Sequence, residues 1–171
     1  CARGLAVRSG RPWVAAAVAA ALLAAGAAVL AARNLSYPGM WWDEAAQFWV
    51  SQGLSNYSPP FAERRGLLEV GRVNRRENLD PGGFSVLLHL WTVGGRGLER
   101  LRALPFAFFL VGTAALALLG WRLTRSVPFA LAAGSVLWLY PAARYFAFEV
   151  RAYSMEMAGV IVSPAPRRQA L

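Results

Sequence analysis

The chain has 171 residues, of which 57% are hydrophobic, and its mean hydropathy is +0.38. A soluble domain of this length is rarely so apolar, so the composition predicts insertion into a membrane. The formal net charge is +9, and all 18 basic residues are arginines scattered among apolar segments. Because they form no basic domain, nucleic-acid binding is excluded, and an anionic membrane surface suits the charge better.

Cysteine and histidine each occur only once, as Cys1 and His89. These counts exclude a disulfide framework and a multi-histidine metal cluster within the chain. The chain does not begin with methionine, and prolines and arginines cut short its last apolar stretch, residues 157–163. Both features lead us to expect a fragment of a longer protein.

The first predicted element is a membrane-spanning helix over residues 13–32, a run of twenty residues without a charge. At about 1.5 Å per residue, this length matches the roughly 30 Å hydrocarbon core of a bilayer. The run exceeds the usual apolar region of a signal peptide, about 7–15 residues. Three arginines precede it and predict a cytoplasmic N-terminus, so the next segment is expected outside.

Residues 33–102 form the predicted external loop, which holds seven of the nine acidic residues. Within it, a juxtamembrane helix is expected at about 43–53, with Asp43 as its N-cap and Gly53 as its stop. One face of this helix is polar and the opposite face is aromatic, so we expect it to lie in the membrane interface. The arginine-rich stretch 61–79 predicts a loop.

A second juxtamembrane helix is expected over residues 82–95. Its apolar part has only twelve residues, which as a helix reach about 18 Å, too short to cross the hydrocarbon core. The distribution of arginines mildly favours the alternative, a crossing that would put Glu149 on the side of the membrane opposite Asp43. We favour the flat arrangement on grounds of length.

Two further charge-free runs predict spans over residues 103–121 and 126–147, and residues 152–163 begin a fourth. The predicted fold class is all-α. Residues 1–171 are expected to form a single membrane domain of a polytopic protein, with three full transmembrane helices, a partial fourth, and interfacial helices in a long first external loop.

An adjacent acidic pair, Asp43 and Glu44, follows two tryptophans that favour the membrane interface. A helix start explains most such pairs. Here, however, other acids recur at the predicted membrane boundaries, at Asp80 and Glu149. A carboxylate close to a low-dielectric boundary suits a general base for a hydroxyl acceptor. The pair Asp43/Glu44 could also hold a divalent cation that neutralises a leaving phosphate.

A second group of candidates lies at the outer end of the third span, where Glu149, Arg151 and Tyr153 alternate. Ionisable residues at a membrane edge are candidates for a functional site, although an ion pair between neighbours explains them equally well. Arg102, at the start of the second span, could bind a lipid phosphate or anchor its helix. Anchoring is the commoner of these two roles.

Four motifs follow one another in this chain: WWDEA, NLDPGGF, LERLRALP and EVRAY. Their order and spacing, over residues 13–160, resemble the N-terminal part of the C-type integral-membrane glycosyltransferases. This family includes bacterial relatives of protein O-mannosyltransferases and aminoarabinose transferases. Each motif alone is weak, and the resemblance rests on their combination.

The resemblance implies sugar transfer from a polyprenyl-phosphate donor to a lipid, glycan or protein acceptor at the external face of a bacterial inner membrane. It makes Asp43 the catalytic carboxylate and Glu44 its partner. It also implies a set of substrate-binding positions: Arg102, Glu149, Arg151, Tyr153 and Asp80. Asp80 stands where the family often has His-Pro-Pro or Glu-Lys-Pro, so its role stays open. Family members differ in metal dependence, so the metal stays open too.

The alternative is a non-enzymatic small membrane protein or a transporter fragment, with Glu149 and Glu156 as ion-pair or proton-path residues. The enzyme interpretation requires Asp43 and Glu149 on one side, converging on one cavity. A transporter has no need of an interfacial helix at 43–52. Because relatives of the enzyme type have many more spans, we expect residues 1–171 alone to be inactive.

Overall fold

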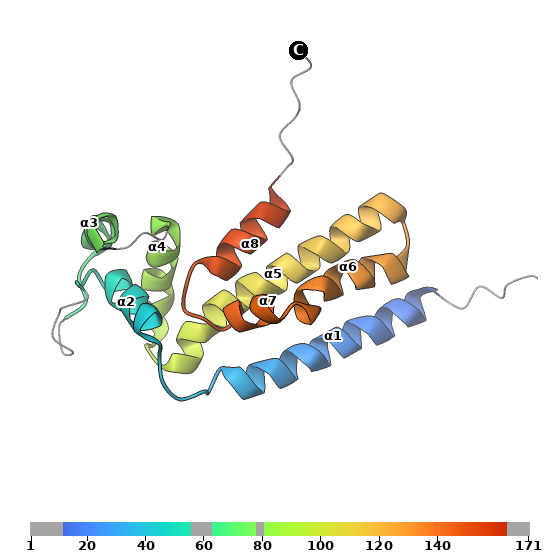
Figure 1. The fold of residues 1–171 in the computed structure, drawn as a ribbon, viewed down its shortest axis with the longest axis horizontal. Coiled ribbons are helices and arrows are strands. Elements are labelled where there is room, and N and C mark those ends of the chain that lie inside the picture. The colour runs from blue at the N-terminus through green and yellow to red at the C-terminus, as the bar shows by residue number, and fades with distance from the viewer. Residues whose placement is uncertain (1–11, 56–62, 78–80, 164–171) are drawn as a thin grey trace, which may run out of the picture.

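The computed structural model describes residues 12–55, 63–77 and 81–163, and every regular element in these ranges is a helix (Figure 1). The expected all-α class is therefore confirmed for this part of the chain. One described helix, α5 (Leu98–Thr124), is long and apolar enough to cross a membrane.

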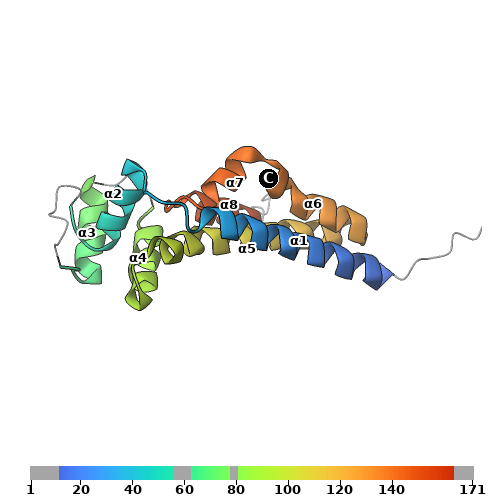
Figure 2. The same cartoon turned by 90° about the horizontal axis from the view of Figure 1, so that it is seen from below.

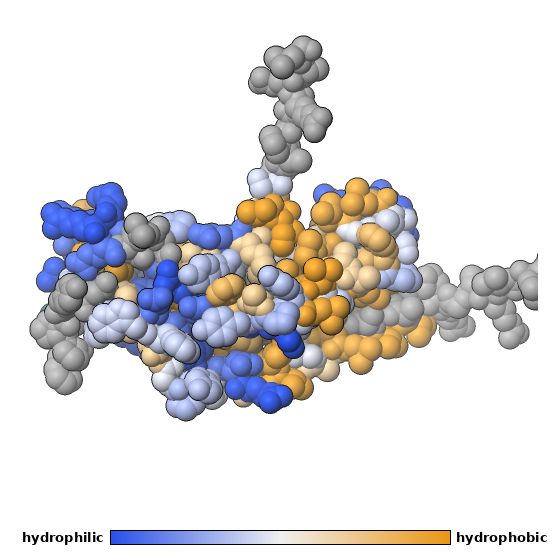
Figure 3. All heavy atoms as spheres, viewed as in Figure 1, coloured by the Kyte–Doolittle hydropathy of each residue, from blue (hydrophilic) through white to orange (hydrophobic). Residues whose placement is uncertain are grey.

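Three helices run side by side in the larger part of the molecule (Figures 1 and 2): α1 (Pro12–Asn34), α5 and α6 (Val127–Leu139). A fourth, α8 (Tyr153–Val162), packs against α5. Aromatic side chains form the core of this bundle, where the Phe106 ring stacks on Phe109 and, at 4.8 Å between centroids, on Phe148. Hydrophobic side chains cover much of its surface (Figure 3).

Helices occur at the positions of the predicted spans, with two differences in their bounds, and among the described residues only α5 has the length and apolar composition of a span. Helix α5 begins at Leu98, before the expected start at residue 103. The expected span 126–147 is divided, because α6 ends at Leu139 and a separate short helix, α7, covers Pro141–Phe146. The residue before a proline is disfavoured in helical geometry, and Tyr140 accordingly has φ −83° and ψ 112°. The break places α7 at the end of the bundle.

Glycines allow α5 and α6 to pack closely. A Cβ atom on Gly120 would lie 3.0 Å from the Cβ of Ala133 and 3.2 Å from the Cα of Ala130. A Cβ atom on Gly134 would lie 3.1 Å from the Cβ of Ala117. Small residues at helix interfaces let backbones approach, which favours helix association in membranes.

We expect Gly120→Ala to destabilise the protein by about 1–3 kcal/mol, because the added methyl group meets backbone atoms of α6 that cannot move aside cheaply. The measurement is denaturant unfolding in detergent. Gly159→Ala in α8 is the matched control, since a Cβ atom there meets nothing within 4 Å. In a helix the control change should stabilise by about 0.5–1 kcal/mol. Equal effects of both changes would contradict the close packing.

Three helices form a cap at one end of the bundle (Figures 1 and 2): α2 (Trp42–Ser51), α3 (Leu67–Glu77) and α4 (Gly82–Trp91), which continues into a 3₁₀ turn, η1 (Thr92–Gly94). Helices α2 and α4 correspond to the helices expected at about 43–53 and 82–95. Helix α4 runs across the direction of α5 rather than along it. The expected stop at Gly53 is confirmed, since this residue has φ +72° directly after the end of α2.

Helix α3 corrects the prediction of a loop over residues 61–79. Its buried residues, Val70, Val73 and Asn74, recur at helical spacing and face the rest of the cap. Its exposed side carries charged residues, and an ion pair joins Glu69 to Arg72 one turn away. The high arginine content concealed this amphipathic pattern in the sequence.

A row of polar side chains is buried in the cap, beside apolar ones such as Phe84 and Leu88. The side-chain amide of Gln47 in α2 donates to the Ser85 hydroxyl in α4 at 2.8 Å, and this hydroxyl donates to the side-chain Oδ1 atom of Asn74 in α3 at 2.6 Å. Helix α2 therefore buries the polar face that carries Glu44, Gln47 and Ser51, and it leaves Trp42 71% exposed. A helix with this arrangement suits an apolar surrounding.

A pH dependence of stability is expected from His89, which is buried in the cap. Burial, together with the charges of Arg64 and Arg96, holds the pKa of His89 below its ordinary value of 6.5. The unfolded chain then binds the proton more readily than the folded one. Stability should be constant above pH 6.5 and should fall below it, by at most about 1.4 kcal/mol per pH unit.

The measurement is the unfolding free energy between pH 8 and pH 5. The Nδ1 atom of His89 lies 2.7 Å from the carbonyl oxygen of Ser51, so the neutral ring donates here from Nδ1. His89→Gln should be less stable than the wild type at pH 8 and should lack the decrease between pH 6.5 and pH 5. A decrease of the same size in both proteins would assign it to other groups.

Candidate functional site

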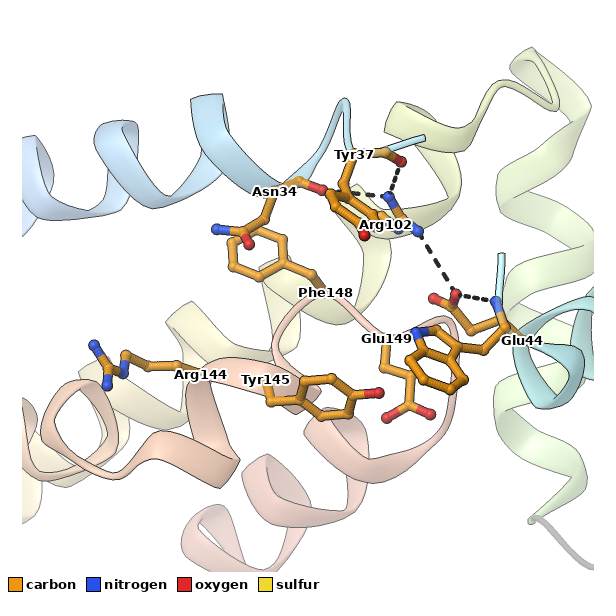
Figure 4. A pocket seen from close by; sticks show the side chains of 9 residues that line it. Asn34, Tyr37, Glu44, Arg102, Arg144, Tyr145, Phe148 and Glu149 are labelled. Carbon is orange, nitrogen blue, oxygen red and sulfur yellow. Dashed lines mark hydrogen bonds and ion pairs between the residues drawn. The ribbon is translucent and has the colours of Figure 1, made fainter. Parts of the chain in front are cut away.

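A cavity of about 260 Å³ lies where the end of α1, the start of α2, the start of α5 and helix α7 meet (Figure 4). Its walls are mostly aromatic and charged, and the lining residues are Asn34, Tyr37, Trp41, Glu44, Arg102, Arg144, Tyr145, Phe148 and Glu149. Pockets that bind drug-sized ligands have volumes of about 300–1,000 Å³. This cavity is smaller than that range, so it suits a ligand group smaller than a drug molecule.

Arg102 forms part of the wall between α5 and the chain that leaves α1. Its side chain is 5% exposed, and its guanidinium donates to the carbonyl oxygens of Tyr37 and, at 2.6 Å, Gly39. It also lies over the Tyr37 ring, at 5.8 Å from the centroid. Because these groups occupy its donors, the geometry favours anchoring, one of the two roles considered for this arginine.

Glu44 is the buried carboxylate of the site, with a side chain only 2% exposed. One carboxylate oxygen accepts from the backbone N–H of Trp41 and the other from that of Val150, each at 3.0 Å. The Nη2 atom of Arg102 lies 3.6 Å away and compensates the charge. Glu44 thus fastens α2 to a segment far along the chain.

The prediction that Asp43 caps α2 is wrong. The N-cap is Trp41, and Asp43 lies in the first turn of the helix. Glu44 reaches back three residues to the N–H of the cap residue, as the acidic member of a capping box does. This hydrogen bond satisfies the backbone N–H of Trp41 at the start of the helix. The side chain of Asp43 takes no part in it and points in another direction.

Asp43 belongs to a second cluster beside the cavity. Its carboxylate lies 3.3 Å from the Nη1 atom of Arg151, whose guanidinium lies 5.4 Å from the centre of the Tyr153 ring. The side chain of Asp43 is 67% exposed, whereas that of Arg151 is 16% exposed. The protein itself therefore does not bury this carboxylate, which lies at the surface of the site.

The sequence did not indicate the other six cavity residues, and two of these, Arg144 and Tyr145, come from one short helix. Both lie on α7, which exists because Pro141 divides the expected span. The Tyr145 hydroxyl can donate a hydrogen bond to a ligand in the cavity. The proline in the sequence YPAARY could have indicated a separate short helix that carries Arg144 and Tyr145.

The structure brings together segments that are 106 residues apart, since Glu44 accepts from Val150. Asp43 and Glu149 accordingly lie at the same end of the molecule. Glu44 and Glu149 line the cavity, whereas Asp43, Arg151 and Tyr153 are not among its lining residues and form a separate cluster. Asp80 lies outside the described residues.

The acidic pair is poorly arranged for a divalent cation. Glu44 is buried against Arg102, whereas Asp43 is exposed and turned toward Arg151. Within residues 12–55, 63–77 and 81–163, no group of three or more potential metal ligands comes together. The two carboxylates therefore act as partners of separate arginines.

Comparison of the chain with protein-family models, with curated proteins and with solved structures finds no match. Functional inference consequently rests on the geometry of this site and on the chemistry of its residues.

Proposed function

We propose that this chain is part of a membrane glycosyltransferase that moves a sugar from a polyprenyl-phosphate donor to a lipid, glycan or protein acceptor. In this proposal α1, α5 and the pair α6–α7 span a bacterial inner membrane, α8 begins a further span, and the cap lies at the external face. The N-terminus is then cytoplasmic. The observation that carries the proposal is the convergence of residues 43–44 and 149–151 beside one cavity.

The location of the cavity supports a substrate attached to a lipid. It lies where the end of α1, the start of α5 and helix α7 meet the cap, so one side of it adjoins the apolar bundle. Figure 3 shows the corresponding boundary between a hydrophobic and a hydrophilic part of the surface. A lipid-linked phosphate would have its chain in the hydrocarbon and its sugar at this boundary.

The proposed reaction assigns Asp43 the role of general base. The acceptor hydroxyl attacks the anomeric carbon of the donor sugar, and its proton passes to the Asp43 carboxylate. The bond between the anomeric carbon and the phosphate oxygen breaks, and polyprenyl phosphate leaves with the electron pair. The exposure of Asp43 suits this role, because the acceptor arrives from the aqueous side, and Arg151 at 3.3 Å holds the carboxylate in place.

The experiment is a transfer assay on the protein expressed from its complete reading frame and reconstituted in liposomes. Polyprenyl phosphates carrying different radiolabelled sugars are supplied as donors, together with an extract of membrane lipids, glycans and proteins as acceptors. We expect label to move from one of these donors to an acceptor only in liposomes that contain the protein. Absence of transfer from every donor would contradict the proposal.

A further inference from the structure

The two ends of the cavity differ chemically. Figure 4 shows the side chain of Arg144 extending from α7 to one end, and Glu149 and Glu44 at the other, with Tyr145 between them. One end of the cavity therefore carries Arg144, the middle is aromatic, and the other end carries Glu149 together with the Glu44–Arg102 ion pair. A ligand with a negative charge at one end and hydroxyl groups at the other would match this order.

Of the two arginines that line the cavity, only Arg144 has a guanidinium that can receive a ligand. Arg102 is buried and directs its donors to backbone carbonyl oxygens and toward Glu44. Arg144 is exposed, and no carboxylate among the described residues forms an ion pair with it. A guanidinium fork matches the oxygens of a phosphate group.

The position of Arg144 favours a phosphate that belongs to a lipid. Helix α7 follows directly on α6, whose exposed side chains include Phe129, Val136 and Leu139. Arg144 thus lies where the apolar bundle gives way to the polar site. A phosphate with an isoprenoid chain would reach this arginine while its chain stayed against the apolar helices.

The aromatic middle of the cavity suits a sugar. Tyr145 lies beside Glu149 in the wall (Figure 4), and Trp41 also lines the cavity. Aromatic rings offer flat apolar faces on which the C–H groups of a sugar ring can pack, and the Tyr145 hydroxyl adds a polar group. A carboxylate such as that of Glu149 accepts hydrogen bonds from sugar hydroxyls.

We propose that Arg144 binds the phosphate of a polyprenyl-linked sugar and that the cavity holds the sugar against Tyr145 and Trp41, with its hydroxyls toward Glu149. This inference rests on the proposed function and adds to it the orientation of the donor and two binding residues. The donor enters from the side of α6, and its sugar points toward the segment that joins Glu149 to Arg151.

The test measures binding rather than transfer, with the complete protein in lipid nanodiscs. The probes are undecaprenyl phosphate, the same lipid carrying mannose, and phosphatidylglycerol as a competing anionic lipid. Arg144→Gln should bind both undecaprenyl lipids about tenfold more weakly, because a hydrogen-bonded charge pair is lost. Tyr145→Leu should bind only the mannosylated lipid more weakly, by about fivefold.

Arg122→Gln is the matched control, since Arg122 is an exposed arginine at the opposite end of α5 and should leave all affinities unchanged. Wild-type affinity in Arg144→Gln would overturn the inference, as would failure of the wild type to bind either undecaprenyl lipid. An equal loss for phosphatidylglycerol would make Arg144 a general lipid anchor and also overturn it. Binding with the expected dependences but without transfer from any donor would support the binding site and contradict only the proposed enzymatic function.

Discussion

Asp43→Asn is expected to lower kcat for sugar transfer by about 10²–10⁴-fold, the usual contribution of a general base. The amide keeps the size of the side chain but cannot take the proton of the acceptor hydroxyl. Folding should be nearly unchanged, because an exposed ion pair such as Asp43 with Arg151 contributes at most about 1 kcal/mol. The measurement is kcat and KM in liposomes, together with the unfolding midpoint of the same preparation.

Two variants separate a catalytic role of Asp43 from a structural one. If Asp43 served only to hold Arg151, then Arg151→Met would lower transfer as much as Asp43→Asn does. The proposal expects a much smaller loss from Arg151→Met, because the carboxylate remains. Glu156→Gln, a change at an exposed acid on α8, should leave transfer at the wild-type level. Activity of Asp43→Asn within threefold of the wild type would remove this residue from the mechanism.

Arg102→Met should destabilise the protein by about 3–5 kcal/mol, the cost of removing one partner of a buried ion pair. The methionine fills much of the volume but leaves the Glu44 carboxylate buried without its countercharge. It also leaves the carbonyl oxygens of Tyr37 and Gly39 without the donors that they now use. Denaturant unfolding in detergent, followed by tryptophan fluorescence, measures the loss.

The double variant Arg102→Met with Glu44→Gln identifies the cause. A neutral amide in place of the carboxylate removes the uncompensated charge, so the double variant should be more stable than Arg102→Met alone. Arg122→Met, at an exposed position, should lie within about 0.5 kcal/mol of the wild type. A cost below 1 kcal/mol for Arg102→Met would show that the pair does not hold α5 to the start of α2.

Much of the helical framework was predictable, because long apolar runs and amphipathic patterns are local properties of a sequence. Residues 13–32 and 82–95 were placed close to the observed helices, and the polar face of α2 was assigned correctly. The failures also have local causes. Pro141 begins a separate helix although the apolar run continues through it. In α3, the many arginines concealed the helical spacing of the buried residues Val70 and Val73.

The candidate site was predictable only as a set of residues and not as an arrangement. Nothing local in the sequence indicates that Glu44 rather than Asp43 turns inward, since both belong to the first turn of one helix. The choice depends on the N–H of Val150 and on Arg102, which tertiary folding supplies. For the same reason, sequence analysis chose acids and arginines near span ends and missed Arg144 and Tyr145.

The bond between Glu44 and the N–H of Val150 also sets a time scale for biosynthesis. A ribosome that adds about 5–20 residues per second needs about 5–20 s to make the 106 residues that separate the two partners. During that interval the Glu44 carboxylate has emerged, or is emerging, without its distant donor. The site therefore cannot exist until the helix pair α6–α7 has been synthesised, and a nascent chain arrested earlier should carry a cap that lacks this bond to Val150.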